Sequence, residues 1–156
     1  DFCDECVRRI VHLEFQSVDY PYPSNDDIRL LAYSMGDQGE VELILYRSET
    51  LQGEHSPRWK EFMVPAKYFE IYPTSYLEVE CFNYNVNASD SLIGRFATKY
   101  GQLLHGVGSI NKYMLTNEDR HKKENMDMEL IKIDANNLFN DITHILTTRY
   151  VWRPFF

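Results

Sequence analysis

The sequence predicts an all-β domain, an antiparallel sandwich of about eight strands with a helix at its C-terminal end. Apolar and polar residues alternate along most of the chain, which is the period of a strand with one buried face. Turns rich in Pro, Gly and Asn separate these segments. Because no helical segments lie between them to cover a parallel sheet, an antiparallel sandwich or barrel is favoured.

The first predicted strand lies in VRRIVHLEFQSV, where Val11, Leu13 and Phe15 fall on one face and polar residues fall on the other. The glycines of GDQGE suit a tight hairpin between the second and third strands. The remaining strands are expected at residues 28–35, 41–46, 59–64, 77–84, 92–97, 110–116 and 126–133.

The stretch 136–149 differs from everything before it, because Leu138, Ile142, Ile145 and Leu146 recur at helical spacing. Asn136 or Asn137 can cap such a helix, and Pro154 ends the element. We therefore divide the chain into a sandwich domain at residues 7–135 and a helical extension or linker at residues 136–156.

Composition limits the function classes. The 156 residues, 44% of them hydrophobic and 14% aromatic, suffice for one packed domain. A formal charge of −8 argues against a general nucleic-acid binder, which needs a dense basic surface. No apolar run approaches the roughly 20 residues of a membrane-spanning helix. Cys3 and Cys6 form a CxxC pair near the chain start, with His12 as a nearby third ligand for a metal, or remain two free thiols.

Two stretches carry a family resemblance: RSETLQGEHSPRWKEF, with its Pro-x-Trp-Lys-x-Phe core, and LEVECFNYNVNASDSLIGRF, a strand, a polar loop and an Ile-Gly-x-Phe strand. Both resemble C2 domains, in detail the second C2 domain of copines. More loosely, the resemblance extends from Val7 to Asp134. It implies an eight-stranded antiparallel C2-type β-sandwich, with Trp59 and Phe62 in its core.

C2 domains place aspartates on two loops at one end of the sandwich, where calcium bridges them to anionic lipid headgroups. Calcium prefers six to eight oxygen ligands, yet this sequence has asparagines where the second loop should have aspartates, and Ser91 replaces a third. The resemblance therefore predicts weak or absent calcium binding. The candidate ligands are Asp19, Asp26, Asp27, Asn83, Asn85 and Asp90.

Two surfaces are candidates for contacting a membrane or a partner. The first loop is stiff and aromatic, with Tyr20 and Tyr22 among prolines, and Val86 lies in the second loop. Tyrosine offers rigid apolar area with a polar end, although the loop can equally pack on itself. Arg120, Lys122 and Lys123 form a basic cluster in the expected loop before the last strand, where a solvated turn is the alternative.

We expect no enzyme, because the histidines are scattered and neither a nucleophile-elbow serine motif nor a phosphate-binding glycine loop is present. The leading hypothesis is a non-catalytic module that binds an anionic phospholipid membrane or a protein partner. The alternatives are a calcium-dependent phospholipid binder and a scaffold that never meets lipid. The resemblance implies a cytoplasmic location, peripheral to the plasma membrane, and a von Willebrand A-like neighbour in a longer chain; the Asn87 glycosylation sequon keeps the secretory route open.

Overall fold

The computed structural model describes residues 9–18, 27–52, 57–71, 74–84, 90–117, 122–136 and 138. The strands in these residues are β1 (Ile10–Val18), β2 (Asp27–Met35), β3 (Val41–Arg47), β4 (Leu51–Gln52), β5 (Phe62–Pro65), β6 (Tyr76–Asn83), β7 (Ser91–Lys99), β8 (Lys112–Asn117) and β9 (Lys122–Asp134). Three short helices connect them: α2 (Lys67–Glu70), α3 (Tyr100–Leu103) and the 3-10 turn η1 (Ser109–Asn111).

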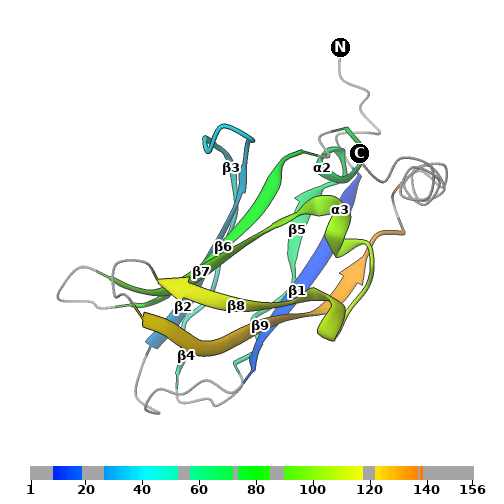
Figure 1. Ribbon diagram of the computed structural model, residues 1–156. Coiled ribbons are helices and arrows are strands. Elements are labelled where there is room, and N and C mark those ends of the chain that lie inside the picture. The colour runs from blue at the N-terminus through cyan, green and yellow to red at the C-terminus, as the bar shows by residue number, and fades with distance from the viewer. Residues whose placement is uncertain are drawn as a thin grey trace.

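The strands pair antiparallel in the order β3-β2-β6-β7-β8-β9-β1-β5, and β4 pairs with the start of β2. This path bends at the β7–β8 junction, where Arg95 opposite Thr116 is the registered pair. Its two halves lie face to face as a sandwich (Figure 1). The rings of Tyr46 on β3 and Phe62 on β5 stack with centroids 4.8 Å apart, which closes the open side of the sandwich.

The core lies between the two layers and follows the predicted alternation. Val11, Leu13 and Phe15 of β1 are fully or almost fully buried, and so is Trp59. Phe15 packs edge-on against Phe96 of β7, with ring centroids 5.5 Å apart across the interior. The predicted all-β sandwich is therefore confirmed, together with the core positions of Trp59 and Phe62.

The structure corrects several predicted boundaries. The strand expected from residue 59 begins at Phe62, since buried Trp59 and Phe62 are three residues apart and break the two-residue period. The strand expected from residue 110 begins at Lys112, after η1. The sequence did not reveal β4 or the short helices, because two to four residues show no measurable periodicity. Of the predicted C-terminal helix, the structure describes only residues 136 and 138.

The last predicted strand was too short. It was expected from residue 126, but β9 begins at Lys122, whose backbone pairs with Asn117 of β8. Lys122 and Lys123 therefore belong to a strand and not to the loop in which the sequence placed them. Backbone pairing of a hairpin continues regardless of side-chain charge, so the polar run KKEN gave no signal of a strand.

Candidate functional site

Several chain connections leave the sandwich at one end, which we call the loop end (Figure 1). Here β2 begins, β6 ends and β7 begins, with Ile28 opposite Asn83 and Asn83 opposite Ser91. The backbone N–H of Tyr84 donates to the carbonyl oxygen of Asp27 at 2.8 Å. The two loops that the sequence singled out, 19–26 and 85–89, are thus anchored on neighbouring strands.

The connection between β8 and β9 belongs to the same end. The side-chain amide of Asn117, at the end of β8, donates to the carbonyl oxygen of Leu92 at 2.8 Å. Asn117 is buried, so this bond ties the turn after β8 to the start of β7. Residues 118–121, which include Arg120, therefore connect strands that end beside the second loop.

A fixed cation lies at the loop end. The guanidinium of Arg29 lies over the ring of Tyr84, 3.5 Å from the ring centroid. Its Nε donates to Thr50 Oγ1 at 2.6 Å, which holds the side chain in place from β2. Such a cation over an aromatic ring is attracted by about 0.5–1 kcal/mol at an exposed site. Arg29 therefore places positive charge beside Asn83 and Asp27, where the sequence led us to expect ligands for another cation.

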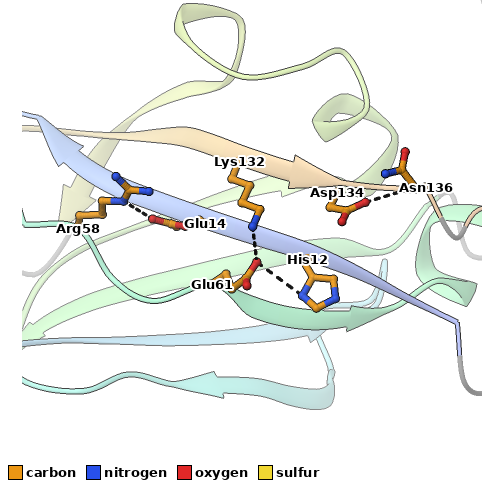
Figure 2. Close-up of polar contacts among 7 residues, drawn as sticks. All are labelled: His12, Glu14, Arg58, Glu61, Lys132, Asp134 and Asn136. Carbon is orange, nitrogen blue, oxygen red and sulfur yellow. Dashed lines mark hydrogen bonds and ion pairs between the residues drawn. The ribbon is translucent and has the colours of Figure 1, made fainter.

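A second polar surface covers the outer face of β1, β5 and β9 (Figure 2). Arg58 donates to Glu14, and Glu61 receives Lys132 at 2.9 Å and faces His12 Nδ1 at 3.6 Å. Hydrogen bonding to Glu61 raises the pKa of Lys132. A shallow hollow of about 470 Å³ is lined by Glu14, Arg58, Trp59, Lys60 and Glu61. Because its cations and carboxylates neutralise one another, this face has no strong field for either sign of ligand.

Sequence reasoning missed this charged face, although part of its signal was visible. The alternation of β1 placed His12, Glu14 and Gln16 on the outer side. It could not show that Glu14 is nearly buried beside Arg58, because the partner is 44 residues away in sequence.

No family model matches the chain. A curated relative, copine family protein 5 of Caenorhabditis elegans, is 26% identical over 124 residues, which is 76% of this chain and 17% of the relative. The chain thus spans about a sixth of that relative's length.

Among solved structures, BON1-C2B matches with a TM-score of 0.59 and 16% identity, over 86% of this chain and 96% of that one. A CC2D1B structure matches with a TM-score of 0.61 and 16% identity, over 92% and 63% of the two chains. A C2 domain of plant extended synaptotagmin 1 gives 0.52 and 14% identity, over 78% and 91%.

The chain is a copine-like C2 domain. The fold likeness and the sequence relative agree with the resemblance carried by the Trp-Lys-x-Phe and Ile-Gly-x-Phe motifs.

In this C2 domain, three of the predicted calcium ligands are described. Asp27 and Asn83 are half-buried at the ends of β2 and β6, and Asp90 is exposed just before β7. Asp27 and Asn83 are brought together through the pairing of β2 with β6. The predicted residues Asp19, Tyr20, Tyr22, Asp26, Asn85, Val86 and Arg120 lie outside the described residues.

The described donors of this C2 domain fall short of a calcium shell. They offer two carboxylates and one amide oxygen, against the six to eight oxygens that calcium prefers. Across the described part of the chain, no group of three or more His, Cys, Asp or Glu side chains is arranged to hold a metal. Cys3 and Cys6 lie outside that part, and His12 faces Glu61. Calcium is therefore not used in any step below.

Two further properties of this C2 domain bear on its chemistry. Burial raises the pKa of the Cys81 thiol, which keeps it protonated and unreactive. None of the helices in the described residues has the length and apolar character needed to span a bilayer.

Proposed function

We propose that this C2 domain is a non-catalytic binding module that engages an anionic phospholipid membrane, or a protein partner, through its loop end. Its calcium site is degenerate, so binding does not depend on calcium. The C2 fold and the copine relative support a binding role. The finer assignment, to the loop end and without calcium, is our inference from the residues found there.

The observation that carries the proposal is the pairing of a retained scaffold with a changed charge. The strand ends that support both loops are aligned, with Asn83 between Asp27 and Ser91 in neighbouring strands. Two unit charges 4 Å apart interact by about 4 kcal/mol at an effective dielectric of 20, before desolvation is subtracted. Replacing aspartates by asparagine and serine removes that attraction for calcium, and the Arg29 guanidinium adds repulsion.

Membrane contact without calcium needs other chemistry, and the sequence supplies it in the same loops. Tyr20 and Tyr22 offer amphipathic rings, and Arg120 offers a cation for anionic headgroups. The domain's charge of −8 opposes a purely electrostatic attachment, which makes aromatic insertion the main contribution. A von Willebrand A-like domain in the full polypeptide remains part of this proposal.

Co-sedimentation with phosphatidylserine-containing vesicles tests the proposal, run in excess calcium and in chelator at two salt concentrations. We expect equal binding with and without calcium and a modest loss at higher salt. Binding only in calcium would support the alternative, a calcium-dependent phospholipid-binding C2 domain. Absence of binding in every condition would favour the scaffold alternative and direct the search to protein partners.

A further inference from the structure

The hairpin formed by β2 and β3 projects from the body at the end opposite the loops (Figure 1). Residues 37–44 are all exposed, although the β2 residues they accompany are largely buried. Val41, Leu43 and Ile44 leave 59%, 40% and 46% of their surface exposed. We call residues 37–44 the β3 arm; its apolar side chains lack a cover within the described part of the chain.

The β3 arm is also a free sheet edge. β3 is the outermost strand of its layer and pairs with β2 on one side, with no strand on its other side among the described residues. A free edge offers unpaired N–H and C=O groups to a further strand. Two bulges in the β2–β3 ladder increase the local twist, which favours a short partner strand over a long flat one.

The charge of the β3 arm selects a basic partner. Asp37, Glu40 and Glu42 are its charged residues, and no ion pair within the described residues involves them. Ser75 donates to Glu42 at 3.3 Å, which orients that carboxylate at the base of the arm. A complementary strand therefore carries cations together with apolar side chains.

One segment of the chain itself has this composition. Residues 149–153, read RYVWR, combine Arg149 and Arg153 with Tyr150, Val151 and Trp152, residue types that favour strands. Pro154 then prevents a longer ladder. The segment lies outside the described residues, and only its sequence enters the argument.

The tether to this segment is long enough. Leu138 is buried in the core, so the chain leaves the body there. Residues 139–148 can span roughly 30 Å when extended, at about 3.3 Å per residue. We propose that residues 149–153 add to the free edge of β3 as a short strand within the same molecule, with their arginines facing the carboxylates of the β3 arm.

Hydrogen–deuterium exchange of the full chain tests this inference. Backbone amides of residues 41–45 are expected to exchange about tenfold slower in the natural chain than in the Arg149→Glu, Arg153→Glu variant, because pairing must open before exchange. Lys99→Glu with Lys112→Glu, on β7 and β8, makes the same charge change elsewhere and should leave β3 exchange unaltered. Adding Glu40→Arg and Glu42→Arg to the tail variant should restore the protection.

Three outcomes would overturn the inference. Equal exchange of residues 41–45 in the natural chain and the tail variant would show that the segment does not pair there. Failure of the charge-swapped combination to restore protection would remove the arginine–carboxylate contact. Protection that falls on dilution would assign the added strand to a second molecule. The tail changes lie beyond the described core, and an unchanged melting temperature of each variant checks that the sandwich remains folded.

Discussion

The Arg29 guanidinium lies 3.5 Å from the ring centroid of Tyr84, the residue between the two asparagines that stand in the second loop. A cation is thus held where related domains would be expected to gather carboxylates around calcium. If charge is what the site lacks, restoring it should restore calcium binding. We predict that Asn83→Asp, Asn85→Asp and Ser91→Asp, combined with Arg29→Gln, give a melting temperature that rises by several degrees in millimolar calcium.

The matched control adds three carboxylates at the opposite end, through Gln38→Asp, Thr74→Asp and Asn136→Asp, all at exposed positions. Neither this control nor the natural chain should respond to calcium. A calcium-dependent rise of several degrees in the natural chain, abolished by Asp19→Ala, would contradict the degenerate site.

Gly94 should tolerate no side chain. A Cβ at this position would lie 2.8 Å from Leu115 Cβ and 3.2 Å from the carbonyl oxygen of Thr116. Gly94→Ala is therefore expected to lower the free energy of unfolding by about 1–3 kcal/mol, measured by urea denaturation. Lys99→Ala, on the same strand but exposed, should change it by less than about 0.5 kcal/mol; equal effects would refute the close approach.

Trp59 should contribute through volume and not through its indole N–H. The side chain is 1% exposed, and its Nε1 has no hydrogen-bond partner among the described residues. Trp59→Ala is expected to cost about 3–5 kcal/mol of stability, and Trp59→Phe clearly less, because no hydrogen bond is lost. A Phe variant as unstable as the Ala variant in urea denaturation would point to an essential polar contact.

Tyr33 should make stability fall at high pH. Burial and then its hydrogen bond to Glu78 raise the pKa of Tyr33 above its usual value near 10. The folded state therefore holds the phenolic proton more tightly than the unfolded state, so stability is fully present below pH 10 and is lost as pH rises further. Tyr33→Phe should flatten the decline of unfolding free energy above pH 10, and an unchanged slope would exclude this residue as its source.

Much of the fold could be predicted from local patterns. Alternation placed Val11, Leu13 and Phe15 in the core, and Leu77, Val79 and Cys81 are likewise buried. Boundaries failed where buried residues break the two-residue period, as between Trp59 and Phe62, or where charged residues continue a ladder, as at Lys122.

The candidate site was less accessible to sequence reasoning. The motifs located both loops, and strand pairing brings Asp27 and Asn83 together at their base. The Arg29–Tyr84 contact joins residues on different strands, and no local pattern announces it. The same holds for the exposed faces of the β3 arm, because an alternating segment looks alike at the centre and at the edge of a sheet.

The most direct test of the account asks which end of the domain binds anionic vesicles. Tyr20→Asp with Tyr22→Asp changes the first loop, and Val41→Asp with Ile44→Asp makes the same charge change at exposed positions of the β3 arm. With co-sedimentation in chelator, we predict that the loop variant binds about tenfold more weakly or worse and that the arm variant binds like the natural chain. Weakened binding by the arm variant, with the loop variant unaffected, would contradict the assignment of the binding surface to the loop end.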